Sequence, residues 1–151
     1  MTTPAPGRAS TEAGRSILAA AQAIVSEAGS RDAALVGARI SSIGWATVDL
    51  ERAERELGEA LGVPLASTPA ARERKLGATT RVSHPFGDGP SLILMEPDTE
   101  GRLAAILARH GEGVALVVVQ AGYRTRRLVL TSVPDGRSRP PLVDRPPSGA
   151  G

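Results

Sequence analysis

Two side chains of this 151-residue sequence are candidates for proton transfer, His84 and Glu96. A histidine side chain can act as a general base near neutral pH. His84 shares one face of a predicted strand with Val82 and Phe86, and a lone histidine in a strand is more commonly a surface or hydrogen-bonded residue. Glu96 ends an apolar run just before Pro97. His84 and Glu96 are therefore the candidate catalytic residues, and the absence of cysteine excludes a cysteine nucleophile, a thiolate metal site and a disulfide framework.

The other polar features indicate structure rather than catalysis. His110 falls in the last turn of a predicted helix, where the helix dipole favours a cation. Glu112 lies in a loop flanked by glycines, so we expect it to be mobile. The Gly87-Asp88-Gly89 segment is typical of a hairpin turn, not of a phosphate-binding loop.

Length and composition favour one domain with a hydrophobic core. With one Trp, one Tyr and one Phe, the core must consist mainly of Ala, Val, Leu and Ile. From Tyr123 onward, six Arg face two Asp, in a chain of net charge +2. A basic end of this kind favours an anionic partner, but the aromatic residues that stack on bases are lacking. We therefore expect no nucleic-acid binding and interpret the basic end as a solvated tail.

Hydropathy argues against a membrane protein. No apolar run approaches the about 18 residues that a membrane span needs. The short apolar stretch Ser16–Val25 has its apolar residues on one side of a helix, unlike the continuous core of a signal peptide. We therefore expect a cytoplasmic protein.

The chain divides into four predicted parts. Residues 1–9 are predicted to be disordered, 10–38 to form a helix and a linker, 39–133 to form the main domain, and 134–151 to be a tail rich in Pro, Gly and Arg. Ser10 or Thr11 caps the helix, which runs to about Ala28 and stops at Gly29. Its apolar stripe needs a partner surface, either the main domain or a second subunit.

The main domain begins with a strand, Ile40–Val48, in which large and small side chains alternate. We expect a helix to pack on the face of Trp45, and open space on the opposite face, which carries Gly44. Asp49 then caps a helix that ends at Gly62. Its predicted buried stripe is Leu50, Ala53, Leu57, Ala60 and Leu61.

A hairpin, Thr79–Phe86 with Pro90–Glu96, follows an ambiguous edge strand within 67–75. Asp98 or Thr99 is expected to cap another helix that closes at Gly111. The run Gly113–Ala121 is strongly β-prone, with Val114, Leu116 and Val118 predicted on one face. A turn then leads into a further strand, Tyr123–Val133.

These elements resemble a known family. The segment Ile43–Ala53, followed by Leu61-Gly62, resembles the first strand and helix of the vicinal oxygen chelate superfamily. Ser91–Pro97 resembles its fourth strand, and His110–Val114 the start of its fifth, most closely as in methylmalonyl-CoA epimerases. Leu142–Gly149 resembles the sixth strand and the turn after it. The resemblance implies an α+β fold with one βαβββ module, an incomplete second module and an extra N-terminal helix.

The same resemblance implies a divalent metal held by four side chains, on strands one, four, five and eight. The matching positions here are Ser42, Ile93 and Leu116, and we expect no eighth strand. Because hydrocarbon side chains cannot coordinate a cation, we expect no metal, no cofactor and none of the family's metal-assisted epimerisation or ring opening.

The positions that would line the family's cavity are instead apolar with a few small polar groups. Such a lining suits an organic ligand held by burial, although the same residues are equally compatible with a filled core. The candidate ligand-binding residues are Ser42, Gly44, Ser91, Ile93, Met95, Leu116, Val118 and Gln120.

The sequence therefore predicts a metal-free protein that binds a small, largely apolar organic ligand or an acyl thioester. One alternative is a metal-independent isomerase, epimerase or cyclase that uses His84 or Glu96. Another is a non-catalytic scaffold or assembly protein. Because an incomplete second module leaves sheet edges exposed, we also expect a homodimer.

Overall fold

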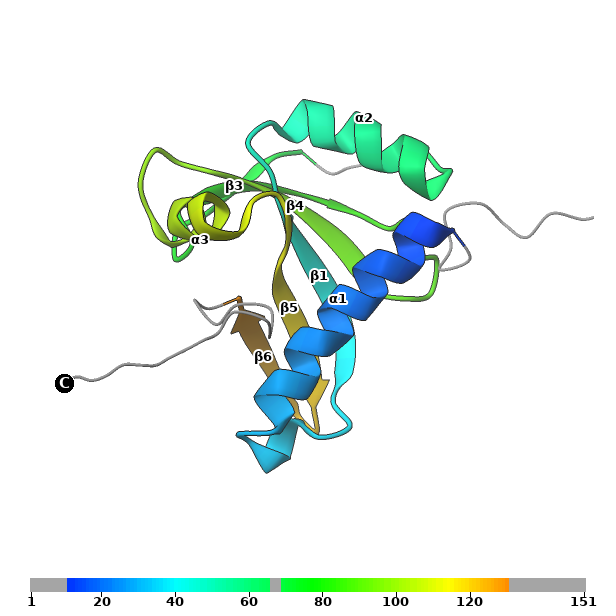
Figure 1. The fold of residues 1–151 in the computed structure, drawn as a ribbon, viewed down its shortest axis with the longest axis vertical. Helices are drawn as coiled ribbons and strands as arrows, with labels where there is room; N and C mark the ends of the chain where they lie inside the picture. The colour runs from blue at the N-terminus through cyan, green and yellow to red at the C-terminus, as the bar shows by residue number, and fades with distance from the viewer. Residues whose placement is uncertain (1–10, 66–68, 131–151) are drawn as a thin grey trace, which may run out of the picture.

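In a computed structural model of the chain, residues 11–65 and 69–130 are described. They form a mixed α+β fold, with one six-stranded sheet and helices on both of its faces (Figure 1). The helices are α1 (Glu12–Gly29), the 3-10 helix η1 (Ala33–Leu35), α2 (Leu50–Leu61) and α3 (Arg102–His110). The strands are β1 (Arg39–Ala46), β2 (Ala71–Glu73), β3 (Ala78–Ser83), β4 (Ser91–Pro97), β5 (Gly113–Ala121) and β6 (Arg124–Val129).

The sheet has the order β2-β3-β4-β1-β5-β6. β1 runs parallel to β4 and antiparallel to β5, so it lies in the middle of the sheet. The path β1-α2-β2-β3-β4 is the βαβββ module that the resemblance implies, and the β5–β6 hairpin extends the sheet on the other side of β1. The predicted fold class is confirmed. The segment Leu142–Gly149 and residues 1–9 lie outside the described residues.

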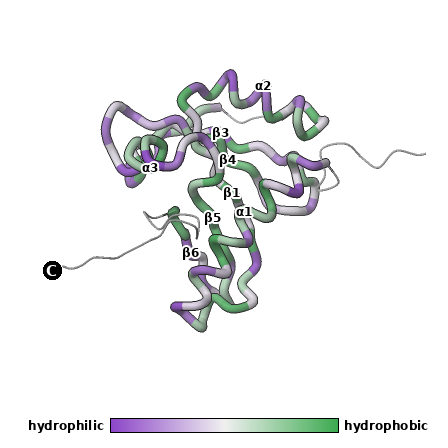
Figure 2. Tube along the Cα trace, in the orientation of Figure 1, coloured by the Kyte–Doolittle hydropathy of each residue, from purple (hydrophilic) through white to green (hydrophobic). Residues whose placement is uncertain are grey.

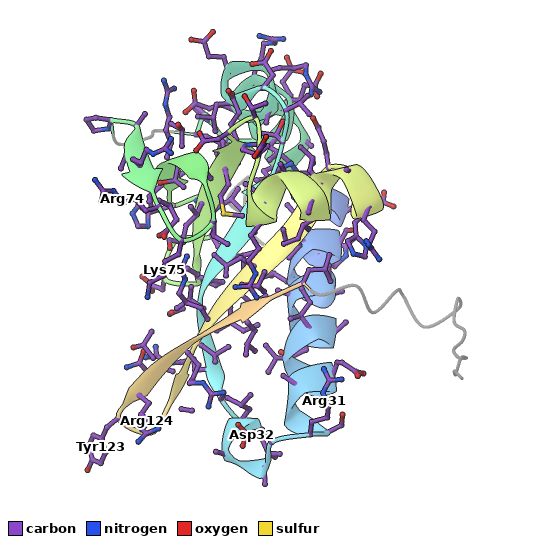
Figure 3. All side chains as sticks on the ribbon, turned by 90° about the vertical axis from the view of Figure 1, so that its left-hand side faces the viewer. Arg31, Asp32, Arg74, Lys75, Tyr123 and Arg124 are labelled. Carbon is purple, nitrogen blue, oxygen red and sulfur yellow. The ribbon has the colours of Figure 1, made fainter. Side chains whose placement is uncertain are left out.

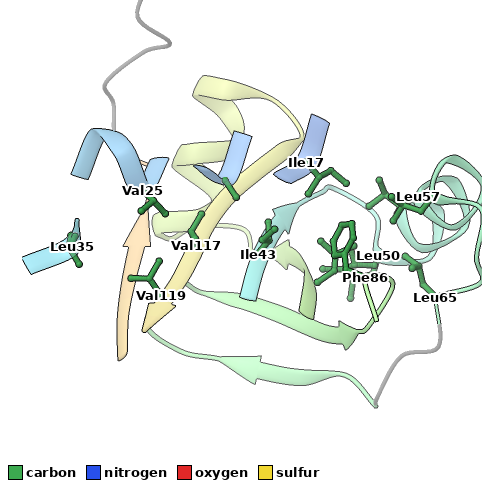
Figure 4. Close-up of a cluster of buried hydrophobic side chains, with 14 residues drawn as sticks. Ile17, Val25, Leu35, Ile43, Leu50, Leu57, Leu65, Phe86, Val117 and Val119 are labelled. Atoms are coloured by element: carbon green, nitrogen blue, oxygen red, sulfur yellow. The ribbon is translucent and has the colours of Figure 1, made fainter. Parts of the chain in front are cut away.

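One face of the sheet, which we call the α1/α2 face, is covered by α1 and α2 (Figures 1 and 4). The strands contribute fully buried aliphatic side chains to it, as expected when a sheet face packs on helices. Along the tube of Figure 2, β5 is largely hydrophobic, whereas α2 alternates between hydrophilic and hydrophobic residues, as a helix with one buried side does. The buried strand residues of this face are Ile43, Leu92, Leu94, Val117 and Val119.

The N-terminal helix α1 belongs to this core. The Thr11 side chain accepts a hydrogen bond from the Gly14 N–H, which confirms Thr11 as one of the two predicted caps. Ile17, Ala21 and Val25 are buried against the sheet, chiefly over β5. The apolar stripe of α1 thus finds its partner within its own domain, and not on a second subunit.

The two ends of α2 are those predicted from the sequence. The Asp49 carboxylate accepts from the Arg52 N–H, and Gly62 ends the helix with a left-handed φ of 81°. The predicted buried stripe is wrong at Ala60, which is exposed. Gly58 is buried instead, because the chain turns back beneath the helix and brings the Val63 carbonyl oxygen to 3.1 Å from the position of a Cβ.

Two further local predictions are wrong. Neither Asp98 nor Thr99 caps α3, because the helix begins later, after Gly101, with no side-chain cap. Val114 packs on the α1/α2 face rather than with Leu116, since the pairing of β1 with β5 shifts between Gly44 and the next residue. Such a β-bulge inserts one residue and exchanges the faces of those beyond it.

No helix among the described residues is long and apolar enough to cross a membrane.

Candidate functional site

The face of the sheet opposite α1 and α2 carries α3, and we call it the α3 face. Cross-strand partners point to the same face, so the register sets its side chains in rows. One row, here named the polar row, consists of Arg127, Val118, Ser42 and Ser91, from β6, β5, β1 and β4 in turn. The adjacent apolar row consists of Val129, Leu116, Gly44, Ile93 and Val82.

The α3 end of this face is a filled core. Met95 is 1% exposed and Leu116 2% exposed, and both pack with Leu103 of α3 and Leu76 of the β2–β3 turn. A Cβ at Gly44 would lie 2.8 Å from Met95 Cε and 2.9 Å from Leu116 Cβ, which is closer than van der Waals contact. The sequence left open whether the candidate ligand-binding residues line a cavity or fill a core. Gly44, Met95 and Leu116 fill a core.

The polar row is only half covered. The Ser42 and Ser91 hydroxyl oxygens lie 2.7 Å apart and share a hydrogen bond, in which either oxygen can be the donor. Because a hydroxyl has one donor and two acceptor positions, the pair retains one proton and several lone pairs for another molecule. The remaining half-buried candidates here are Ile93, Val118 and Gln120, the last accepting a hydrogen bond from the Thr125 hydroxyl at 3.2 Å.

Sequence reasoning missed Arg127, which it assigned to the basic tail. The guanidinium lies 3.3 Å from a carboxylate oxygen of Glu73. Since these residues belong to β6 and β2, at opposite ends of the strand order, the sheet curls until its two edges approach across the α3 face. The alternation in 124–129, which puts Arg127 and Val129 on one face, was the available signal.

The three positions that correspond to metal ligands in the resembled family do share the α3 face. They supply one hydroxyl oxygen, from Ser42, and two hydrocarbon side chains, from Ile93 and Leu116. This donor set does not fit a divalent metal, which requires several N, O or S ligands. Within residues 11–65 and 69–130, no three His, Cys, Asp or Glu side chains gather as a metal site would require.

Of the two candidate catalytic residues, Glu96 is engaged away from the serine pair, whereas the β3–β4 register, in which Ser83 pairs with Leu92, would place His84 opposite Ser91 if it continued by one residue. Met95 points to the α3 face, so the next residue, Glu96, points to the opposite face. The Glu96 carboxylate accepts a hydrogen bond of 3.0 Å from the Leu50 N–H in the first turn of α2. His84 is exposed, one residue beyond the end of β3. A catalytic role for either residue stays a prediction.

Glu112 is anchored, contrary to the expectation of a mobile loop residue. One of its carboxylate oxygens accepts hydrogen bonds from the buried Thr47 hydroxyl and the Val48 N–H, each at 3.0 Å, and from the Arg52 guanidinium. Burial alone raises the pKa of Glu112, but the bonds from Val48, Arg52 and Thr47 outweigh it and lower this pKa overall. Together with Glu96, Glu112 fixes the start of α2 at the top of β1, because carboxylates satisfy the N–H groups there.

Comparison with known proteins finds likeness at the level of fold. No known family model matches the chain, and no curated protein matches it. Methylmalonyl-CoA epimerase from Mycobacterium tuberculosis is 20% identical, with a TM-score of 0.48, over 55% of this chain and 55% of that chain. A hypothetical protein from Bacillus halodurans is 18% identical, with a TM-score of 0.46, over 54% of this chain and 57% of that one.

A further methylmalonyl-CoA epimerase structure, in complex with methylmalonyl-CoA, is 23% identical, with a TM-score of 0.45, over 54% of this chain and 59% of that one. The chain thus spans little more than half the length of these structures.

Proposed function

We propose that the open part of the α3 face binds a small, largely apolar organic ligand, or an acyl thioester, without a metal. The observation that carries this proposal is the half-buried pair of hydroxyls, Ser42 and Ser91, 2.7 Å apart and flanked by Ile93 and Val118. A ligand that covers the aliphatic side chains gains about 25 cal/mol per Å² of apolar surface removed from water. The hydroxyls orient it, since they can both donate to and accept from a carbonyl group.

The size of the ligand follows from the part of the face that is not filled. The polar row crosses four strands, from β6 to β4, which is about 14 Å at the usual strand spacing. Toward α3, the packed side chains of Met95 and Leu116 close the space. A short, extended molecule that lies along the polar row fits this surface better than a bulky one.

The enzymatic alternative, a metal-independent isomerase, epimerase or cyclase, needs a proton-transfer group beside the ligand. Glu96 is one candidate for this group, but its carboxylate is already hydrogen-bonded to the Leu50 N–H on the α2 side of the sheet. His84, exposed just beyond β3, remains the candidate for that group, so the enzymatic function is a second proposal, tested by the loss of turnover in His84→Ala. Three expectations remain predictions: a scaffold role, a cytoplasmic location and a homodimer. Analytical ultracentrifugation tests the homodimer.

The proposal is tested by solution NMR of methyl-labelled protein titrated with octanoate, octanamide and methylmalonyl-CoA. At least one of the three should perturb the methyl groups of Ile93 and Val118. The methyl groups of Ile43 and Val117, neighbouring strand positions buried on the α1/α2 face, are the matched control and should change little. Shifts confined to the control methyls, or none with any of the three compounds, would contradict the proposed site.

A further inference from the structure

Arg127 stands at one end of the proposed site, with its charge directed to the α3 face. It is the direct cross-strand partner of Val118, which in turn is the partner of Ser42. Two strand spacings, about 10 Å, separate the backbones of Arg127 and Ser42. A ligand that lies along the polar row would therefore meet hydroxyls at one end and a guanidinium at the other.

We infer that the ligand carries a carboxylate, that Arg127 binds this group, and that the Glu73 carboxylate occupies the same place in the free protein. This inference rests on the proposed function and narrows its ligand to an organic acid. A guanidinium presents parallel N–H groups that match the two oxygens of a carboxylate, which makes it selective for such an anion over a neutral amide.

The Arg127–Glu73 ion pair is suited to being exchanged. Its nitrogen and oxygen are 3.3 Å apart, and the two side chains are 36% and 29% exposed. An ion pair so open to water is weakly held, because water and salt screen it. A ligand carboxylate that also buries apolar surface therefore competes well with Glu73.

Glu73 has other stabilising groups when Arg127 leaves it. Its second carboxylate oxygen accepts a hydrogen bond of 3.1 Å from the Lys75 backbone N–H. The side chains of Arg74 and Lys75 are exposed at the same β2–β3 turn (Figure 3), so the local charge there is positive. Exchange of partners would thus leave Glu73 in a hydrogen-bonded, cationic environment.

The neighbouring Arg126 provides a matched control. It pairs with Val119, a residue of the α1/α2 face, and its guanidinium lies 3.3 Å from Asp32. Arg126 and Arg127 thus share a strand, a charge and an ion pair of the same length, but they differ in the face of the sheet to which they belong.

The test is isothermal titration calorimetry of octanoate and octanamide with four proteins: the unmodified chain, Arg127→Gln, Glu73→Gln and Arg126→Gln. The unmodified protein should prefer octanoate. Arg127→Gln should weaken octanoate binding about tenfold or more, the usual effect of losing a hydrogen bond to a charged group, and leave octanamide unchanged. Glu73→Gln should strengthen octanoate binding about two- to fivefold, because the competing carboxylate is gone. Arg126→Gln should change neither affinity.

Both Arg127→Gln and Glu73→Gln break the same ion pair, so a purely structural effect would move octanoate affinity in the same direction in both. Changes in opposite directions support the inference, and changes in the same direction overturn it. If the unmodified protein binds octanoate and octanamide equally at Ile93 and Val118, the inference fails while the proposed function stands. If neither compound binds, the inference fails, and methylmalonyl-CoA remains the probe that decides the proposed function.

Discussion

Replacing Gly44 with Ala tests whether the α3 end of the sheet face is filled. The added methyl would lie 2.8 Å from Met95 Cε and 2.9 Å from Leu116 Cβ. Met95 can rotate away, but a Cβ is fixed to its backbone, so β5 itself would have to move relative to β1. Overpacking of this kind lowers the free energy of unfolding by about 1–3 kcal/mol. Because Ala leaves the unfolded chain less conformational freedom than Gly, up to about 1 kcal/mol of this loss is offset.

Gly44→Ala should therefore lower the free energy of unfolding by about 1–2 kcal/mol, measured by urea denaturation. For a domain of this size, that corresponds to a fall in melting temperature of about 4–8 °C. Gly29→Ala is the matched control, since its Cβ would meet no atom closer than 3.7 Å. That variant should be as stable as the unmodified protein, or slightly more so, because Ala favours a helix. A Gly44→Ala protein of unchanged stability would refute the packing described here and reopen this end of the face to a ligand.

Three further substitutions follow from the same structure. Glu112→Gln should cost about 1–3 kcal/mol near pH 7, because charge-assisted hydrogen bonds are lost. Folding lowers the pKa of Glu112 below its ordinary value of 4.5. The contribution of Glu112 to the free energy of unfolding is therefore complete above pH 4.5 and disappears as the pH falls through the folded-state pKa. Urea denaturation curves of Glu112→Gln and of the unmodified protein should converge in acid. Asp49→Ala should cost about 1 kcal/mol by removing the α2 cap, seen as a lower urea midpoint with an unchanged slope. Ile17→Ala should lower the free energy of unfolding by about 2–5 kcal/mol, because Ile17 is 3% exposed and its truncation leaves a cavity in the core. A loss of stability below about 1 kcal/mol in calorimetry would show that α1 docks only loosely.

The features that sequence reasoning predicted correctly depend on short-range signals. Asp49 and Gly62 delimit α2 because a carboxylate cap and a left-handed glycine act within one turn of the helix. The period of two along β1 and β4 placed Ser42 and Ser91 on one face, as observed.

The features that it missed depend on pairing between distant segments. The bulge that turns Val114 to the α1/α2 face arises from the register between β1 and β5, which the sequence of β5 alone does not encode. Which face α3 covers is likewise undetermined by its apolar stripe, although that choice decides how much of the predicted lining is core. The contact of Arg127 with Glu73 requires the curl of the whole sheet.

The position of α1 also has a consequence for biosynthesis. The first helix of the described chain packs on η1 and α2, which follow it closely, but also on β5, which is about eighty residues further along, so part of its docking surface is missing when it leaves the ribosome. At about 5–20 residues per second, the wait lasts roughly 4–17 s. During that interval the nascent chain exposes an amphipathic helix of the kind that chaperones bind, and slower translation would lengthen its dependence on them.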